Sequence, residues 1–110
     1  MKSVGRTTGL TWVYMTAPSR AVARRIAKAL VAERLAACVN VLGPMESIYR
    51  WKGAVEQARE VALIAKTRQG RLAALTARVA ELHPYEVPCV VALPIRGGHR
   101  AFLSWVREET

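Results

Sequence analysis

Residues 38–66 read CVNVLGPMESIYRWKGAVEQAREVALIAK, and this stretch decides the fold. β-Branched and aromatic residues are frequent in 38–42 and 47–51, and β-branched residues return in 60–66 after a turn at Lys52-Gly53. Such runs on either side of a glycine-containing turn predict a β-hairpin. Gly43-Pro44 interrupts the first strand, as a bulge or bend would. The hairpin is long for a chain of 110 residues, since strands average about 5–6 residues.

Strand and helix patterns alternate on both sides of the hairpin. Before it, residues 10–16 (LTWVYMT) have the composition of a strand. Ser19 is then a suitable N-cap for a helix over residues 19–36. After the hairpin, apolar residues at helical spacing predict a helix over residues 69–82, which ends at His83-Pro84.

The last part of the chain completes the pattern. Residues 89–93 (CVVAL) predict a strand, and Pro94 places its end there or places it at a sheet edge. A short helix over residues 100–109 follows the Gly97-Gly98 turn. The order β-α-β-β-α-β, followed by a C-terminal helix, predicts an α+β fold of the ferredoxin-like type.

The length and composition fit one folded domain. We expect residues 10–110 to form it and the polar residues 1–9 to be a flexible leader. No apolar run approaches the roughly 18–20 residues of a membrane span, and residues 1–9 lack the apolar core of a signal peptide. We therefore expect a cytoplasmic protein with no membrane contact, in which Cys38 and Cys89 are reduced.

The chain carries few residues suited to catalysis. All 8 acidic residues are glutamates, and there are two histidines and two cysteines. Without aspartate there is no Ser-His-Asp triad, and the glycine-rich phosphate-binding motifs and the zinc-protease motif are missing from the sequence. Because no nucleophile, base and orienting group can be assembled, we expect neither enzymatic activity nor an organic cofactor.

The basic balance of the chain does not by itself predict nucleic-acid binding. The 17 lysines and arginines exceed the 8 glutamates and give a formal net charge of +9. The basic residues are dispersed, without a run of five, and the aromatic-rich motif of RNA-binding sheets is missing from the sequence. A solvated, arginine-rich surface is the favoured interpretation, and we do not expect a nucleic-acid partner.

The predicted hairpin extends beyond what two helices can cover. It carries Ile48, Tyr49 and Trp51, and an uncovered strand with exposed aromatic residues is prone to aggregation. Pairing with other copies of the same chain removes this hazard, so we expect a homo-oligomer. The alternative is that Tyr49 and Trp51 fold back on their own sheet.

Six segments match one known family in order and spacing and cover nearly all of the chain from Leu10 onward: TAP (16–18), AERLAACVN (32–40), SIYRWKGAVE (47–56), ALIAKT (62–67), ELHPYEVPCVVALPI (81–95) and FLSWV (102–106). These segments resemble the family of the divalent-cation tolerance protein CutA. The resemblance implies a ferredoxin-like fold and a homotrimer in which the long hairpins join neighbouring subunits. It also implies an architecture similar to PII signalling proteins and a role in tolerance of copper and other divalent metals, with no established reaction.

Three residues are candidate metal ligands. Metal proposals for the family use a thiol at the end of the first strand and two adjacent histidines before Pro-Tyr, and here these positions hold Met15, Leu82 and His83. Imidazole and sulfur are ligands that copper prefers, so copper is the expected metal and Cys38 is a third candidate. Each has a structural alternative: His83 caps a helix, Met15 fills the core, and Cys38 is a buried thiol.

A second group of residues is expected to line a ligand cleft between subunits. Its members are aromatic or charged and lie in the hairpin or just after the second helix. A lysine among them, with nearby arginines, suits a small anionic ligand, whereas ordinary interface packing is the alternative. The group is Tyr49, Trp51, Lys66, Tyr85 and Glu86.

Two functions follow as expectations. The first is a homotrimeric protein of metal-ion tolerance that binds divalent metal ions, copper foremost, weakly at surface or inter-subunit sites. The alternative is a PII-like regulatory module that binds a small anionic ligand or a partner protein at the cleft between subunits.

Overall fold

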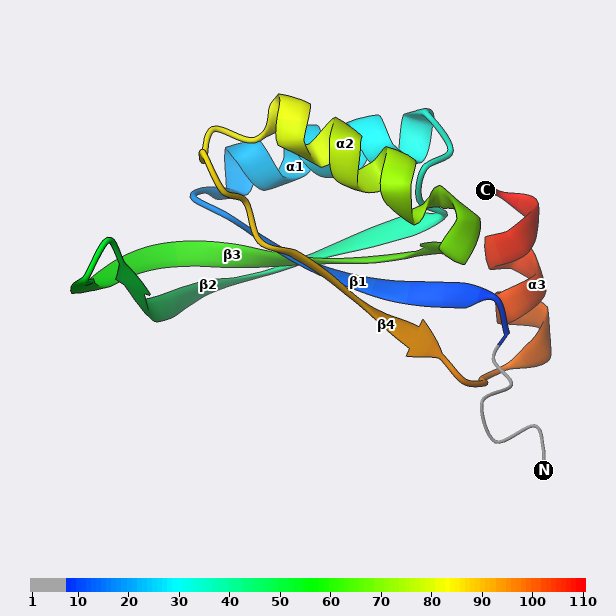
Figure 1. The fold of residues 1–110 in the computed structure, drawn as a ribbon. Coiled ribbons are helices and arrows are strands. Elements are labelled where there is room, and N and C mark those ends of the chain that lie inside the picture. The colour runs from blue at the N-terminus through cyan, green and yellow to red at the C-terminus, as the bar shows by residue number, and fades with distance from the viewer. Residues whose placement is uncertain (1–7) are drawn as a thin grey trace.

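The structure, a computed structural model, describes residues 8–110. Its strands form one antiparallel sheet in the order β2-β3-β1-β4, and the helices pack around this sheet (Figure 1). This arrangement confirms the predicted ferredoxin-like α+β fold. The elements are β1 (Leu10–Ala17), α1 (Arg20–Ala32), β2 (Cys38–Trp51), β3 (Ala54–Arg68), the 3-10 helix η1 (Gln69–Arg71), α2 (Leu72–Leu82), β4 (Val90–Ile95) and α3 (Arg100–Glu108).

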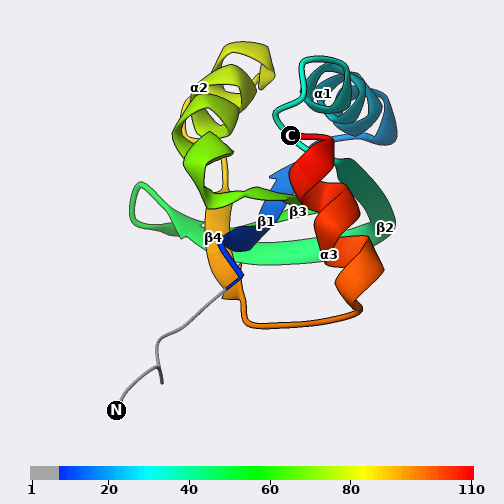
Figure 2. The same ribbon diagram turned by 90° about the vertical axis from the view of Figure 1, so that its right-hand side faces the viewer.

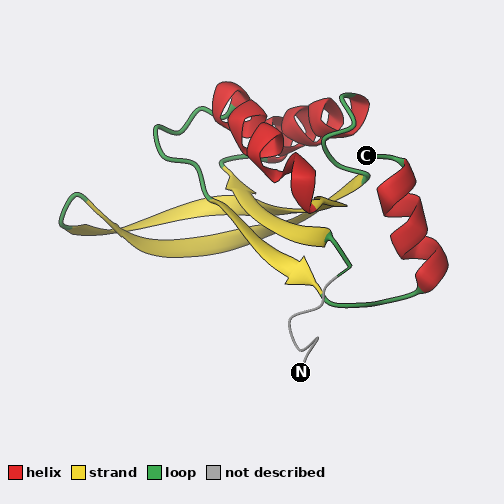
Figure 3. Ribbon diagram, turned by 45° about the vertical axis from the view of Figure 1, so that its right-hand side comes forward, coloured by secondary structure: helices red, strands yellow, loops and turns green. Residues whose placement is uncertain are grey.

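The hairpin of β2 and β3 is the longest feature of the molecule. Its strands have 14 and 15 residues, and their tip projects beyond the two helices that cover the sheet (Figures 1 and 3). The turn holds Lys52 at φ 51° and Gly53 at φ 83°. Two left-handed residues in succession match the right-handed twist of the flanking strands, which is why a glycine stands in this turn.

A bulge divides β2, as the Gly43-Pro44 pair predicts. Leu42 lies opposite Ala62, but the next regular pair joins Met45 to Glu60. Two residues of β2 therefore face the single residue Val61, which is the arrangement of a β-bulge. The bulge lets the 14 residues of β2 pair with the 13 residues 54–66 of β3 in one continuous hairpin.

Helices α1 and α2 cover one face of the sheet (Figure 1). Ser19 caps α1 as predicted, because its Oγ accepts a hydrogen bond from the backbone N–H of Val22 at 3.2 Å. The predicted apolar stripe of α2 also points inward. The core beneath the helices includes Val13 and Met15 of β1, Leu63 of β3, Ile26 and Leu30 of α1, and Leu75 and Val79 of α2.

Helix α1 ends earlier than the sequence predicts, at Ala32 instead of near residue 36. Arg34 adopts φ 60°, and the backbone N–H of Leu35 turns back to the carbonyl of Leu30 at 2.8 Å. A left-handed residue with returning hydrogen bonds is a common helix terminus, usually marked by glycine. An arginine at this position gives no such mark, so the alanine-rich sequence conceals the end of the helix.

The face of the sheet opposite α1 and α2 is largely uncovered and apolar. The register places Trp12 beside Lys66 and Leu93, and Tyr14 beside Ile64 and Val91. Val91 and Leu93 are 57% and 59% exposed, which is unusual for aliphatic side chains in a sheet. We call this surface the open face; its residues are Trp12, Tyr14, Cys38, Asn40, Leu42, Ile64, Lys66, Val91 and Leu93.

Strand β4 forms a sheet edge, consistent with Pro94, and α3 packs beside one end of the sheet (Figure 2). Leu103 and Val106 of α3 cluster with Leu10. Thr8 is already tied to this region, since its Oγ1 donates to the carbonyl of Ile95 at 2.6 Å. Thr8, within the expected leader 1–9, is thus part of the folded structure, and residues 1–7 of that leader lie outside the described part of the chain. No helix in residues 8–110 is long and apolar enough to cross a membrane.

Candidate functional site

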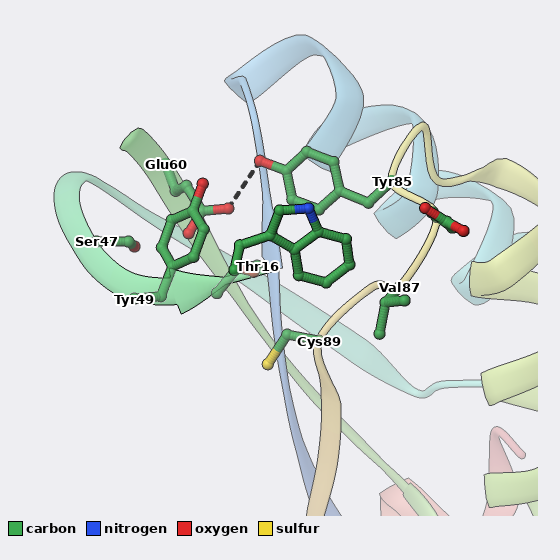
Figure 4. Close-up of a pocket in the computed structure, with 9 residues that line it drawn as sticks. Thr16, Ser47, Tyr49, Glu60, Tyr85, Val87 and Cys89 are labelled. Carbon is green, nitrogen blue, oxygen red and sulfur yellow. Dashed lines mark hydrogen bonds between the residues drawn. The ribbon is translucent and has the colours of Figure 1, made fainter. Parts of the chain in front are cut away.

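A cavity of about 480 Å³ lies where the hairpin meets the segment between α2 and β4 (Figure 4). Strand β2 supplies Ser47, Tyr49 and Trp51, which are spaced two residues apart and therefore lie on one side of the strand. Thr16 of β1 and Glu60 of β3 line the same cavity. The sheet thus supplies one wall, built from three strands.

The segment after α2 supplies the other wall. Tyr85, Glu86, Val87 and Cys89 line the cavity from this side. Helix α2 ends at Leu82 because the residue before a proline is disfavoured in the α region, and His83 has the extended values φ −83° and ψ 137°. The chain then runs along the cavity before β4 begins at Val90.

His83 holds this segment against the sheet. Its Nε2 lies 2.7 Å from the carbonyl oxygen of Thr16, and its Nδ1 accepts a hydrogen bond from the backbone N–H of Tyr85 at 3.1 Å. A carbonyl can only accept, so Nε2 carries the proton and the ring is the neutral tautomer. The side chain is only 7% exposed. Both nitrogens are therefore engaged with the backbone, and neither is free to bind a metal in this arrangement.

Tyr85 and Glu60 join the two walls. The phenolic O–H of Tyr85 donates to Oε2 of Glu60 at 2.8 Å (Figure 4), and the Glu60 residue is only 8% exposed. Burial and this hydrogen bond to a carboxylate raise the pKa of Tyr85 to about 12. The hydroxyl thus stays protonated and keeps donating to Glu60 well above neutral pH.

The cavity is acidic and aromatic, and four of the five residues expected at the cleft between subunits line it within the single chain. Tyr49, Trp51, Tyr85 and Glu86 do line it, but Lys66 does not. Lys66 lies six positions beyond Glu60 on β3, about 20 Å along the strand, and its Nζ donates to Oδ1 of Asn40. Among residues 8–110 no lysine, arginine or histidine lines the cavity, so its charge does not favour an anionic ligand.

The three predicted metal ligands do not form one site within the chain. Met15 is 1% exposed and belongs to the core beneath the helices, which agrees with its role as core filler. Cys38 lies opposite Lys66 on the open face, while Met15 lies opposite Leu63, three positions along β3. His83 has both nitrogens engaged. In residues 8–110 no group of three or more His, Cys, Asp or Glu side chains is arranged to hold a metal ion.

Both cysteines are free thiols, as expected, and both are half-buried. Cys89 faces the cavity, where burial and the nearby Glu60 carboxylate raise the pKa of its thiol. A raised pKa disfavours the thiolate, which is the form that binds soft metals. Cys38 lies on the open face and is the candidate for a ligand shared between copies.

Sequence reasoning missed Glu60 and Cys89 as members of the site. The sequence shows each of them only as part of a strand, and their approach to Tyr85 depends on the pairing register. One signal was available: Glu60 is an acidic residue at the start of a strongly apolar run, and a buried carboxylate is rare unless it has a partner.

These features define the class of protein. It is a small α+β chain with a ferredoxin-like sheet, a long bulged hairpin and a cavity at the end of that sheet. Comparison with known proteins makes the class specific. Residues 11–109 match the family described as CutA1 divalent ion tolerance protein, and the chain belongs to this family. The predicted resemblance is thereby confirmed. The family is named for tolerance of divalent ions and not for a reaction.

Relatives from distant organisms support this assignment. The divalent-cation tolerance protein CutA of Thermus thermophilus is 54% identical over 98 residues, covering 89% of this chain and 95% of the relative. Its solved structure superposes with a TM-score of 0.90 at 52% identity, covering 92% of this chain and 98% of that one. The chloroplastic CutA 1 of Oryza sativa is 43% identical over 110 residues, and this chain spans only 62% of its length. The solved CutA1 from the same plant has a TM-score of 0.91 at 43% identity, covering 94% and 95% of the two chains.

Proposed function

We propose that this chain acts in metal-ion tolerance as a homotrimer that binds divalent metal ions, copper foremost, weakly at sites on its surface or between its subunits. The observation that carries the proposal is the family match over residues 11–109. A binding role without catalysis fits the small inventory of reactive side chains. It also fits a family that is named for a tolerance phenotype.

The open face supports the oligomer. An antiparallel sheet usually has polar residues on the side that meets water, whereas this one carries Trp12, Tyr14, Val91 and Leu93 there. A contiguous apolar surface of this kind is typical of an interface. The uncovered edges of β2 and β4 supply unpaired backbone groups beside it, which a neighbouring copy can use.

Assembly also offers a route to a metal site. Within one chain the described residues hold no cluster of three suitable ligands, so a metal must draw on more than one copy or on water. Cys38 lies on the open face, where the proposal brings copies together, and sulfur is a preferred ligand of copper. Weak binding follows, because each chain contributes few ligands.

Free thiols support a reducing compartment, and we propose the cytosol. The names of the relatives differ on this point. Two plant relatives are called chloroplastic, and the solved protein of Archaeoglobus fulgidus is called periplasmic.

The test combines mass with metal titration. Light scattering during gel filtration should give three times the mass of one chain, and a monomer would contradict the oligomer. Equilibrium dialysis against Cu(I), Cu(II) and Zn(II) should then show Cys38→Ser binding copper at least tenfold more weakly than the unaltered protein. Cys89→Ser is the matched control and should bind as the unaltered protein does. Equal copper binding by all three proteins would remove Cys38 from the site.

A further inference from the structure

We propose that the cavity between Tyr49, Trp51, Tyr85 and Glu60 is a binding site for a small organic ammonium cation. This proposal concerns a different ligand class from the metal ions discussed above and does not depend on them. It rests on the aromatic walls, on the buried carboxylate between them, and on a lining that, within residues 8–110, includes no positively charged side chain.

Three aromatic side chains border the cavity from two directions. Tyr49 and Trp51 come from β2, and Tyr85 comes from the segment after α2. The faces of aromatic rings carry partial negative charge and attract ammonium groups within about 6 Å of the ring centroid. The His83 ring contacts the Tyr85 ring with centroids 4.6 Å apart, and His83 is itself fixed by two hydrogen bonds. One wall is therefore held in place before any ligand arrives.

Glu60 supplies a full negative charge at the same cavity. It is 8% exposed, and no lysine or arginine of residues 8–110 forms an ion pair with it. Its one side-chain hydrogen-bond partner in the described part of the chain, the hydroxyl of Tyr85, is neutral. A buried carboxylate is costly unless a positive charge compensates it, and a cation in the cavity would do so. Glu86, at the rim, adds a second carboxylate of the same sign.

One cation already lies near the face of the Trp51 ring. Nζ of Lys52 lies 5.7 Å from the centroid of the Trp51 ring, near the outer limit for such a contact. Lys52 stands in the exposed turn and is not among the residues that line the cavity. Its ammonium group therefore competes with a ligand for the Trp51 ring, and its removal should favour binding.

The residues that line the cavity favour binding of organic cations over hard metal ions. Magnesium and calcium require six or more oxygen ligands in a compact shell, and the cavity offers two carboxylates among aromatic walls. A cavity of about 480 Å³ is in the range of small-molecule sites and far larger than one metal ion needs. An alkylated ammonium ion, which sheds its water easily and presents methyl groups to the rings, fits both the size and the charge.

The experiment titrates the assembled protein with tetramethylammonium chloride at constant ionic strength, with tert-butanol as the neutral probe of similar size. Chemical shifts of the Trp51 indole and of the backbone amides of Tyr85, Glu86, Val87 and Cys89 report on the cavity. We expect saturable shifts with tetramethylammonium and none that saturate with tert-butanol. Equal responses to the two probes, or no saturation with tetramethylammonium in the intact oligomer, would overturn the proposal.

Two pairs of variants separate binding from folding. Glu60→Gln should weaken binding at least tenfold, whereas Lys52→Ala should bind at least as tightly as the unaltered protein. Tyr85→Leu should lose binding, but Tyr85→Phe keeps the ring and frees the Glu60 carboxylate, so it should retain binding. Loss of binding in Tyr85→Phe with its fold intact by circular dichroism, or unchanged binding in Glu60→Gln, would refute the assignment. The copper titrations test Cys38, which does not line the cavity. The proposal of copper binding and the proposal of ammonium binding can therefore fail independently of each other.

Discussion

The phenolic oxygen of Tyr85 lies 2.8 Å from Oε2 of Glu60 and joins two segments that are 25 positions apart in the chain. Through this bond the segment after α2 is tied to β3, and the cavity acquires two walls that belong to different parts of the fold. The same bond makes the stability of the molecule sensitive to alkaline pH.

We expect the free energy of unfolding to fall as the pH rises from about 10 to about 12. The pKa of Tyr85 is raised from 10.0 to about 12 by burial and by the Glu60 carboxylate. A raised pKa in the folded state stabilises the protein below the unfolded pKa, and this contribution disappears as the pH passes the folded value. Urea unfolding at pH 9, 10 and 11.5 measures the effect. Tyr85→Phe cannot ionise there, so its stability should fall less over this range, and an identical fall would contradict the assignment.

His83 should matter for stability and not for metal binding. His83→Ala leaves the carbonyl of Thr16 and the backbone N–H of Tyr85 without their side-chain partner in a buried place, which costs about 2–3 kcal/mol. Urea unfolding should show this loss, while copper binding by the folded fraction should be unchanged. His83→Asn is the matched variant, because its short side chain keeps one acceptor and one donor. A metal affinity that drops in both variants would show that His83 is a ligand after all.

Two glycines of the hairpin should respond differently to alanine. Gly43 has φ 135°, and a Cβ there would lie 3.1 Å from Cα of Val61. Gly53 has φ 83° but open space around it. Gly53→Ala should therefore cost only the left-handed conformation, roughly 1–2 kcal/mol, and Gly43→Ala should cost more because backbone must also move. Thermal unfolding of both variants checks the order, which would be wrong if Gly53→Ala were the less stable protein.

A charge on the open face should break the oligomer. Leu93 is 59% exposed in the single chain and lies beside Trp12. If another copy covers the open face, the Leu93→Lys substitution would bury an unpaired ammonium group in the interface, which is costly. We expect light scattering to give a lower mass for this variant. Val31→Lys is the control, since Val31 is an exposed residue of α1 on the other side of the sheet. A full-sized oligomer in Leu93→Lys would move the interface away from this face.

Local patterns account for what the sequence could predict. The hairpin, its bulge and the stripe of α2 all follow from residues within a few positions of one another, and all three are confirmed. Tyr49, Trp51, Tyr85 and Glu86 could be picked out because tyrosine and tryptophan are rare in the chain and because these residues stand near turns and helix ends.

Longer-range geometry accounts for what the sequence could not predict. Lys66 was assigned to the cleft by its chemistry, but the pairing register places it opposite Cys38, far from the cavity. Glu60 was not predicted as a site residue, because its carboxylate joins the site only through the hydrogen bond from Tyr85, which is distant in the sequence. With Lys66 outside the cavity and the Glu60 carboxylate inside it, the cavity is negatively charged. The expected ligand is therefore a cation and not an anion.

The bulge also determines which changes of chain length the hairpin can absorb. Between the Leu42–Ala62 pair and the turn, β2 has nine residues (43–51) and β3 has eight (54–61). Removing one residue from this part of β2 would make the two sides equal, so the bulge could straighten while Trp51 kept its partner. Removing one from β3 would leave nine against seven. The extra residue of the bulge is thus present in β2 only. A one-residue deletion should be tolerated in residues 43–51 of β2 and not in residues 54–61 of β3.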